Sequence, residues 1–451
     1  MTSTRHAADG RTAAVVMAAG LSTRMRSATP KHFHPLLGRP MVDWVIAVAR
    51  ELGADPLVVV TSPQSVDRFD GVTVAVQEEP RGTGDAVAAA RNALDGFDGD
   101  VYVLSGDTPL LTAEVLTALR DEHRRAAADA TLLSFEPDTP FPYGRVVRDR
   151  ESGAVLEVVE EGDTTEEQRA IRELNSSTYV FRADALWRAL DRLDARNAQG
   201  ELQLTDAIAH VIADGGAAAA HRSEDPRAPI GVNTRADLAT AGAVLRARVN
   251  EAHMLAGVTI VDPGSTWIEA DVELEADATI HPFTVLRGRT RVAAGAEVGP
   301  HAVLADAVVG NGALVGPFCY LRPGTVLEEG AKAGAFVEIK NSRLGRGAKV
   351  PHSAYVGDAD VGEGANVAAG NITANYSHYP GREKGRTVIG RNVRTGVDNV
   401  FVAPVEIGDD AWVAPGSVIT EDVPPGSLAG FPPRQVTKEG WVYDKRDDDA
   451  D

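Results

Sequence analysis

An apolar residue recurs every six positions through most of the second half of this 451-residue chain, with a one-residue shift after Leu304. The series is Ile280, Leu286, Val292, Val298 and Leu304, then Val309, Val315, Leu321, Leu327, Ala333 and Ile339, continuing at Leu344, Val350, Val356, Val361, Val367 and Val413. An amphipathic helix repeats every 3.6 residues and a half-buried strand every 2, so neither produces this pattern. Hexapeptide repeats build parallel β-helices in which the apolar side chain points to the axis. The period therefore predicts a parallel β-helix.

One segment interrupts the hexapeptide period. It runs from Asn375 to Arg386 and reads NYSHYPGREKGR. Because it cannot complete a coil, we expect it to leave the β-helix as a loop. Loops on a rigid scaffold commonly carry binding and catalytic residues, so a site is expected near this loop.

The first half follows a different pattern. Short β-branched runs such as AAVVMA, PLVVVT and DVYVLSG alternate with amphipathic stretches. This alternation predicts a mostly parallel α/β sheet, which binds its ligand at the carboxyl ends of the strands. We expect a flexible extension at 1–11, an α/β domain at 12–232, a linker helix at 233–255, a β-helix domain at 256–441 and an acidic tail at 442–451.

Composition argues against several classes of protein. The formal net charge is -20, which disfavours broad nucleic-acid binding. The single Cys319 cannot form an internal disulfide, and no apolar run has the length of a membrane span. The first dozen residues lack the apolar region of a signal peptide. We therefore expect a cytoplasmic enzyme that binds small molecules, with no nucleic-acid or membrane partner.

A loop rich in small residues follows the first expected strand. It reads Ala18-Ala19-Gly20-Leu21-Ser22-Thr23-Arg24-Met25 and is followed by Thr29-Pro30-Lys31. Small residues let backbone N–H groups approach phosphates, and Arg24 and Lys31 can neutralise a leaving pyrophosphate. Taken alone, the loop could equally be a plain turn between a strand and a helix with two solvated bases.

Together with its downstream motifs, the chain resembles the bacterial bifunctional enzymes that act as UDP-N-acetylglucosamine pyrophosphorylase and glucosamine-1-phosphate N-acetyltransferase. The N-terminal motifs are MAAGLSTRMRSATPK, QEEPRGTGDAV, LSGDTPLL, YGRVVRD, VVEE, RELNSSTYVF, LQLTDAI and GVNTR. The C-terminal motifs are LRPG, FVEIKNSRLG, PHSAYVGDADVG, NVAAGNITANY and KEGW. The resemblance implies an α/β Rossmann-like nucleotidyltransferase domain followed by an all-β left-handed parallel β-helix, in a homotrimer that supplies precursors of the cell wall.

The resemblance implies two reactions. Acetyl-CoA would acetylate glucosamine 1-phosphate, and UTP would then uridylylate N-acetylglucosamine 1-phosphate with release of pyrophosphate. Mg²⁺ would be bound by Asp107 and Asn233, whose side chains offer hard oxygen ligands. Arg24 and Lys31 would be catalytic. The remaining contacts with UDP-N-acetylglucosamine would come from Ala18, Ala19 and Gly20, from Gln77, Gly82 and Thr83 at the uracil, and from Gly144, Glu160 and Asn175 at the sugar. Asp107 alone could equally form a turn before Thr-Pro, and the other polar residues could equally be loop or capping residues.

The C-terminal motifs imply an acetyl-transfer site. His352 would be the general base, a role that suits an imidazole with an ordinary pKa near 6.5. The sugar phosphate would be bound by Arg322, Lys340, Tyr355 and Asn366, and acetyl-CoA by Ala369, Asn375 and Tyr376. A histidine at a coil corner and basic residues on an open coil could each also be ordinary surface groups.

Several positions depart from the family pattern. Ser22 replaces a glycine, Asp85 replaces the histidine of GTGHA, and Ser105 replaces the tyrosine of YGD. Val397 replaces a serine near acetyl-CoA, and Pro432 replaces an arginine, with Arg434 two residues on. Two alternatives therefore stay open. The β-helix could carry a different acyltransferase, or it could be a non-catalytic module for oligomerisation or regulation.

Overall fold

The computed structural model describes residues 10–20, 23–138, 142–376, 383–430, 435–441 and 443. The chain divides into two compact units, Met1–Leu245 and Arg246–Asp451. The division falls within α7, a helix of 21 residues at Arg235–Leu255. In the described part of the chain, no helix is both long and apolar enough to cross a membrane.

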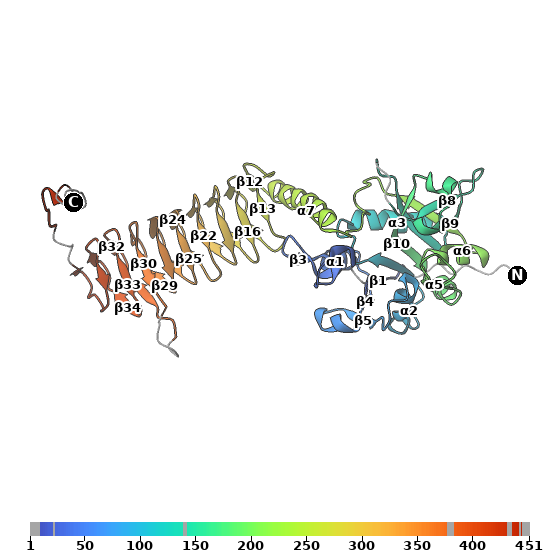
Figure 1. The fold of residues 1–451 in the computed structure, drawn as a ribbon, viewed down its shortest axis with the longest axis horizontal. Helices are drawn as coiled ribbons and strands as arrows, with labels where there is room; N and C mark the ends of the chain where they lie inside the picture. Colours follow the sequence, from blue (N-terminus) through green and yellow to red (C-terminus); the bar gives the residue numbers. More distant parts are fainter. Residues whose placement is uncertain are drawn as a thin grey trace, which may run out of the picture. The chain divides into compact units, whose positions relative to one another are not determined.

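The first unit is built on a mixed sheet (Figure 1). Its strands are β1 Thr12–Ala18, β4 Leu57–Thr61, β5 Thr73–Val76, β6 Asp100–Ser105, β7 Ala130–Phe135, β8 Arg145–Arg148, β9 Val155–Val159, β10 Leu174–Arg182 and β11 Ala218–Arg222. The main order is β11-β7-β10-β6-β1-β4-β5, and β8 pairs with β10 and β9. β1 runs parallel to β4 and β6, whereas β10 runs antiparallel to β6 and β7. The sheet is thus parallel in the half that contains β1.

Helices cover both faces of this sheet. They are α1 Met41–Glu51, α2 Thr83–Ala89, α3 Ala113–Arg125, α4 Glu166–Arg169, α5 Ala183–Leu190 and α6 Asp206–Ala213, with a hairpin of β2 Pro35–Leu36 and β3 Arg39–Pro40. Alternate residues of β1 enter two different cores. Val15 packs in the core that contains residues of α2, α5 and α6, and Val16 in the core that contains residues of α1 and α3. Each fully buried aliphatic side chain contributes about 1.5–3 kcal/mol.

The parallel strands bring the N-terminal motifs to one edge of the sheet. β1 leads into the loop that carries Gly20 and Lys31, β5 leads to Gln77, and β6 leads to Asp107. Because these strands run in the same direction, their carboxyl ends lie together, which is where open α/β sheets bind ligands.

The second unit is a stack of short parallel strands in three sheets (Figure 1), here named faces A, B and C. Face A contains β12 Thr259–Ile260, β15 Thr279–Ile280, β18 Glu297–Val298, β21 Leu314–Val315, β24 Lys332–Ala335 and β27 Lys349–His352, and continues through a bridge at Asn366 to β32 Arg394–Thr395, β35 Trp412–Val413 and β37 Leu428–Ala429. Face B contains β13 Trp267–Ile268, β16 Val285–Arg287, β19 Val303–Ala305, β22 Tyr320–Leu321, β25 Glu338–Lys340, β28 Tyr355–Gly357, β30 Ile372–Ala374, β33 Val400–Val402 and β36 Val418–Ile419. Face C contains β14 Glu273–Leu274, β17 Arg291–Val292, β20 Val308–Val309, β23 Val326–Leu327, β26 Arg343–Leu344, β29 Ala359–Val361, β31 Thr387–Ile389 and β34 Val405–Ile407.

The residues of the hexapeptide series form the interior of this stack. Leu286 pairs in register with Leu304, which pairs with Leu321, and Leu321 pairs with Ile339. All four side chains have no exposed surface. The segment at 375–386, which the sequence predicted to leave the β-helix as a loop, lies between β30 and β31, and its residues 377–382 lie outside the described residues. The predicted fold class, an α/β domain followed by a β-helix, is confirmed.

Candidate active sites

The first unit contains a cavity of about 620 Å³ at the carboxyl ends of the parallel strands. Most of the predicted N-terminal site residues line it, namely Ala19, Gly20, Arg24, Lys31, Gln77, Gly82, Thr83, Asp107, Gly144, Glu160, Asn175 and Asn233. Ala18 does not, because its side chain points into the core that includes α1 and α3. The cavity therefore gathers residues that are more than 200 positions apart in the sequence.

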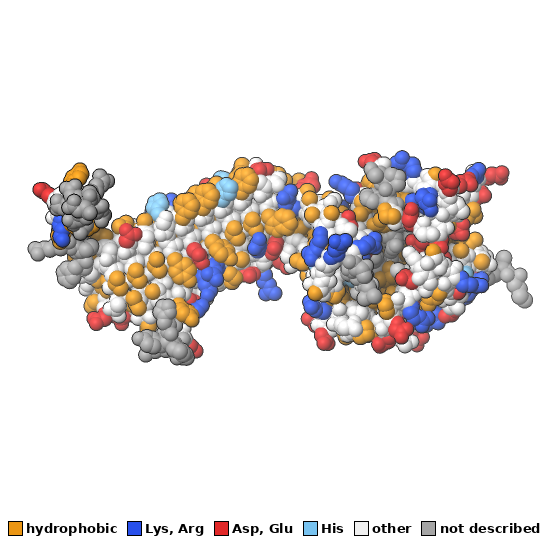
Figure 2. All heavy atoms as spheres, in the orientation of Figure 1, with side chains coloured by type: hydrophobic (Ala, Val, Ile, Leu, Met, Phe, Trp, Pro, Cys, Tyr) orange, Lys and Arg blue, Asp and Glu red, His pale blue; other side chains and the backbone are white. Residues whose placement is uncertain are grey.

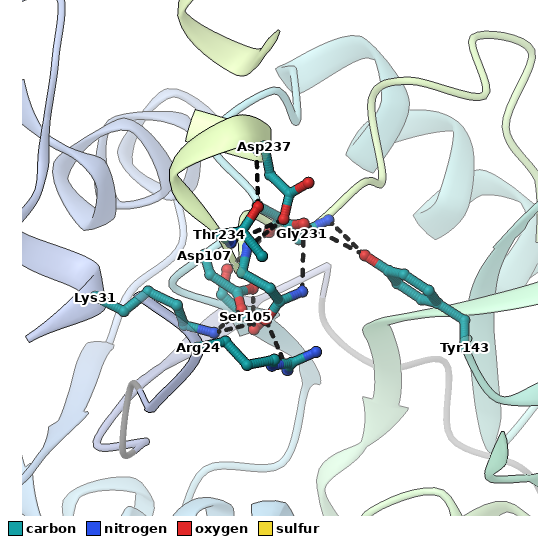
Figure 3. A network of polar contacts seen from close by, with 10 residues as sticks. Arg24, Lys31, Ser105, Asp107, Tyr143, Gly231, Thr234 and Asp237 are labelled. Atoms are coloured by element: carbon teal, nitrogen blue, oxygen red, sulfur yellow. Dashed lines mark hydrogen bonds and ion pairs between the residues drawn. The ribbon is translucent and has the colours of Figure 1, made fainter. Parts of the chain in front are cut away.

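A charged cluster occupies one part of this cavity (Figure 3). The Lys31 ammonium is paired with the Asp107 carboxylate and lies 3.3 Å from Oδ1 of Asn233. Arg24 also donates to Oδ1 of Asn233, at 2.9 Å. Ser105 donates to the second oxygen of Asp107, at 2.7 Å. Two cationic side chains and three oxygen-bearing side chains thus converge within hydrogen-bond distance.

Burial would disfavour ionisation of Asp107, but the Lys31 ammonium outweighs it and holds the pKa of Asp107 below its ordinary value. The neighbouring His32 is buried, and this burial, together with Lys31, lowers the pKa of the imidazole to about 4. His32 is therefore neutral and Asp107 ionised at neutral pH. The pair Lys31–Asp107 is then a charged pair beside an uncharged ring.

The donor set around Lys31 fits a magnesium ion. Asp107 offers a carboxylate and Asn233 an amide oxygen, and both contact the same ammonium group, so the two oxygens already surround one cation. Mg²⁺ is commonly bound by one or two protein carboxylates together with substrate phosphates and water. The remaining ligands could come from a nucleotide.

A tight loop forms a second part of the cavity. Gly82 has φ +122 and ψ 175, a conformation that is essentially restricted to glycine. A β-carbon there would lie 2.5 Å from the carbonyl oxygen of Leu202. Leu202 holds the loop from both sides, since its N–H donates to Arg81 and its carbonyl accepts from Gly84, each at 2.8 Å. The LQLTDAI motif therefore shapes the loop that carries Gly82 and Thr83.

A third part of the cavity contains the residues predicted to bind the sugar. The N–H of Asn175 donates to the carbonyl of Gly144 at 2.9 Å. The side chain of Asn175 donates to the hydroxyl of Tyr179 at 2.8 Å and accepts from the N–H of Ser177. Burial raises the pKa of Glu160, and the carboxylates of Asp206 and Asp163 raise it further. Glu160 thus faces the cavity at an energetic cost, which is typical of a functional carboxylate.

In the second unit, the predicted phosphate-binding residues gather on face B. Arg322 directly follows β22, and its N–H donates to the carbonyl of Ile339 in the next coil, which places it beside Lys340. Lys340 pairs with Gly357, and the hydroxyl of Tyr355 lies directly over Gly357. Glu338 pairs with Arg322 at 2.8 Å. Arg322, Lys340 and Tyr355 therefore form one polar group across three coils.

Lys384 joins this group, although its sequence position gave no indication of it. A side-chain hydrogen bond with Lys384, together with the repulsion between the two like charges, lowers the pKa of Lys340. The loop is held at its base by Arg386, which pairs with Asp360 through two hydrogen bonds of 2.6 and 2.7 Å. Two adjacent ammonium groups beside Arg322 make a strong candidate site for a phosphate.

His352 and two predicted acetyl-CoA positions follow one corner of the β-helix. Ser353, next to His352, accepts from the N–H of Gly370, and Asp398 donates through its N–H to the carbonyl of Ala369. His352, Ala369 and Val397 therefore occupy the same corner in successive coils. His352 is exposed, and Val397 is 46% exposed.

Asn375 lies at the base of the extended loop. Its side chain is buried and donates to Asp358, which also accepts from Asn341 at 2.6 Å. These hydrogen bonds help to hold the pKa of Asp358 below its ordinary value, against the opposing effect of burial. Tyr376, the next residue, is 69% exposed.

Asn366 does not lie with the other predicted phosphate ligands. It is on face A, where it bridges Lys349 and Arg394, whereas Lys340 is on face B. Within one chain the acetyl-site residues are thus divided between two faces and the corner that joins them. Pro432 and Arg434 lie outside the described residues.

Comparison with known proteins identifies the family. Residues 14–203 match the MobA-like NTP transferase domain. Over 96% of its length the chain is 46% identical to the bifunctional protein GlmU of Mycolicibacterium gilvum, covering 92% of that protein. It is 43% identical, again over 96% of its length, to the bifunctional protein GlmU of Trichlorobacter lovleyi, covering 99% of that protein.

The chain belongs to the bifunctional GlmU family.

The predicted family and the assignment as a transferase are thereby confirmed. Full-length GlmU relatives support bifunctional synthesis of UDP-N-acetylglucosamine, and the NTP transferase domain supports uridylyl transfer. The structure adds residues that the sequence analysis did not single out, although Tyr143 and Ser177 lie within the quoted motifs. His32, Tyr143, Ser177 and Asp237 line the first cavity, and Lys384 joins the second site. Tyr143 anchors Gly231 through a hydrogen bond of 2.9 Å, and Asp237 accepts from the N–H of Asn233 at 3.0 Å.

Proposed function

We propose that the two sites carry out consecutive steps, acetylation of glucosamine 1-phosphate in the second unit and uridylylation of the product in the first. The observation that carries the proposal is the cluster of Arg24, Lys31, Asp107 and Asn233 in a cavity that also contains Gln77 and Asn175. Such a cavity combines a cationic centre with a part suited to a base and a part suited to a sugar. These three parts match a nucleoside phosphate joined to a sugar phosphate.

In the uridylyl step, the phosphate oxygen of N-acetylglucosamine 1-phosphate attacks the α-phosphorus of UTP, and the bond to pyrophosphate breaks. The nucleophile is already an anion, so the protein supplies position and charge neutralisation more than a base. Arg24 and Lys31 neutralise the charge that accumulates on the leaving pyrophosphate. Glu160 and Asn175 hold the sugar.

We assign a magnesium site to Asp107 and Asn233. When bound, the ion would screen the charge between the two reacting phosphates. Ser105 donates to Asp107, and Asp237 binds the backbone N–H groups of Asn233 and Thr234, so both ligands are oriented by further hydrogen bonds. Orientation of this kind is typical of metal ligands.

In the acetyl step, the amine of glucosamine 1-phosphate attacks the thioester carbonyl of acetyl-CoA, a C–N bond forms and the C–S bond breaks. His352 accepts the proton that the amine loses, and coenzyme A leaves as its thiolate. Arg322, Lys340 and Tyr355, together with Lys384, bind the phosphate of the sugar. Ala369, Asn375 and Tyr376 contact the acetyl donor.

We further propose that three copies of the chain associate through face B. Its outward column runs in register through Trp267, Val285, Val303, Tyr320, Glu338, Tyr355, Ile372, Val400 and Val418, and it is apolar except at Glu338 and the two tyrosine hydroxyls. Figure 2 shows hydrophobic side chains in rows along the second unit. Association would also allow Asn366 of one copy to meet Lys340 of another, and so complete an acetyl site whose residues are divided between two faces. Light scattering of the purified protein tests this, and a monomer would refute it.

One assay tests the two reactions. The purified protein is supplied with glucosamine 1-phosphate, acetyl-CoA, UTP and Mg²⁺, and the products are resolved with each substrate omitted in turn. We expect free coenzyme A without UTP, and pyrophosphate from N-acetylglucosamine 1-phosphate without acetyl-CoA. If the second reaction occurs but no coenzyme A is ever released, the proposed acetyltransferase is wrong.

A further inference from the structure

The side chain of Gln77 is held by two acceptors. Its Nε2 donates to the carbonyl oxygen of Gly82 at 3.0 Å and to Oδ2 of Asp85 at 2.9 Å. Gln77 is 6% exposed and lines the cavity of the first unit. Asp85 is one of the positions at which this chain departs from the family motif, GTGDA instead of GTGHA.

These contacts determine which way the amide faces. The two ends of a glutamine amide differ only in donor or acceptor character, so the surrounding groups decide its orientation. A carboxylate and a carbonyl oxygen both accept, so the reversed amide would place its oxygen against two other oxygens. Gln77 therefore keeps both N–H bonds toward the protein and leaves Oε1 as the group that it offers to a ligand.

The backbone of Gly82 supplies the complementary group. Among the described residues, none accepts a hydrogen bond from the N–H of Gly82. This N–H and Oε1 of Gln77 together present one donor and one fixed acceptor. Uracil has the matching edge, with O4 to accept and N3–H to donate. Cytosine has the reverse order, an amino donor followed by the N3 acceptor. Its amino group would face the N–H of Gly82, donor against donor, and its N3 would face Oε1 of Gln77, acceptor against acceptor.

We propose that Asp85 is a positioning residue that sets the preference for uracil over cytosine by fixing the Gln77 amide. The inference rests on the proposed function, in which Gln77 and Gly82 read the nucleotide base. Asp85 acts through Gln77 and need not touch the nucleotide. Guanine also presents an acceptor beside an N–H donor, so the amide orientation by itself does not separate uracil from guanine.

The test compares the use of UTP and CTP by Asp85→Leu, Asp85→Asn and Asp85→His. Leucine removes the acceptor, asparagine retains a neutral one, and histidine restores the residue of the family motif, whose ring nitrogen can accept from Nε2. Asp95→Leu makes the same change at an exposed position outside the cavity, and Arg81→Ala removes the ion pair that Arg81 forms with Asp85 at 3.8 Å. Pyrophosphate release is measured with N-acetylglucosamine 1-phosphate as the second substrate.

We expect the ratio of kcat/KM for UTP to that for CTP to fall at least about tenfold in Asp85→Leu, the effect of losing one hydrogen bond to a charged group. The change should lie mainly in the KM values of the nucleotides, with the KM of the sugar phosphate unchanged. Asparagine should be intermediate, and histidine and both controls should resemble the unaltered protein.

A ratio within about twofold of the unaltered protein in Asp85→Leu, with an unchanged unfolding temperature, would overturn the inference while leaving uridylyl transfer intact. If Asp85→Leu does not fold, Asp85→Asn decides by the same criterion, with a fall in the ratio of more than about twofold counting in favour. If the unaltered protein uses no UTP, the proposed function itself fails. The two failures are therefore distinct.

Discussion

Gly82→Ala is expected to impair uridylyl transfer by displacing the loop that contacts the nucleotide base. At φ +122 and ψ 175 the backbone of Gly82 is in a region that costs other residues about 1–3 kcal/mol. The new β-carbon would lie 2.5 Å from the carbonyl oxygen and 2.7 Å from the nitrogen of Leu202. These are backbone atoms, so the clash cannot be relieved by a change of rotamer.

Movement of the loop would also weaken two hydrogen bonds of Leu202, to Arg81 and Gly84. Each contributes about 1 kcal/mol, so the total loss of unfolding free energy is about 3–5 kcal/mol. We expect the KM for UTP to rise at least about tenfold, because the N–H of Gly82 and the amide of Gln77 no longer keep their spacing. Acetyl transfer should be unchanged, since its residues lie in the other unit.

Gly153→Ala is the matched control. Gly153 has φ +72, but a β-carbon there meets nothing within 4 Å. The Gly153→Ala variant should therefore lose only about 1 kcal/mol of unfolding free energy, and its KM for UTP should be unchanged. Urea unfolding and pyrophosphate-release kinetics measure both effects. Equal behaviour of the two variants would contradict this explanation, because, of these two glycines, only Gly82 combines a positive φ with a clash.

Three further predictions concern stability. Burial raises the pKa of Glu160 in the folded protein, so the folded state loses stability as pH rises through this raised pKa and the carboxyl ionises. Glu160→Gln should therefore be more stable than the unaltered protein at pH 8, as measured by thermal unfolding. Its KM for the sugar phosphate should be higher. Despite burial, His123 and Arg124 hold the pKa of Asp100 in the folded protein below its ordinary value of 3.8. The ionised carboxylate therefore contributes fully to the free energy of unfolding above the ordinary pKa, and this contribution is lost as pH falls through the pKa of the folded protein. Asp100→Asn should therefore cost about 2 kcal/mol at pH 7 and progressively less below pH 4 in urea titrations. Ile339→Ala should destabilise the β-helix by about 2–5 kcal/mol in calorimetry, with no change in uridylyl transfer.

The sequence predicted the β-helix well because its signal is local and repeated. Leu286, Leu304, Leu321 and Ile339 occupy one interior column as their spacing implies. The interruption at 375–386 was equally clear, since one missing period suffices to show it. The parallel half of the α/β sheet could also be predicted, because short β-branched runs alternate with amphipathic stretches in the sequence.

The interactions of the sites were less accessible to sequence reasoning. Contact between Gly82 and Leu202 joins residues 120 positions apart and depends on the path of the chain around the sheet. Lys384 lies in a segment that lacks the hexapeptide period, so the sequence pattern could not predict that it lies close to Lys340.

The central claim is that one chain carries two independent sites, the product of one being the substrate of the other. Asp107→Asn removes the negative charge of a proposed metal ligand from the first unit, and His352→Ala removes the proposed base from the second. The most direct test follows conversion of glucosamine 1-phosphate by each variant alone and by their mixture. We expect Asp107→Asn to accumulate N-acetylglucosamine 1-phosphate, and His352→Ala to form UDP-N-acetylglucosamine only from supplied N-acetylglucosamine 1-phosphate. The mixture should complete both steps. Loss of both reactions in either folded variant would contradict it.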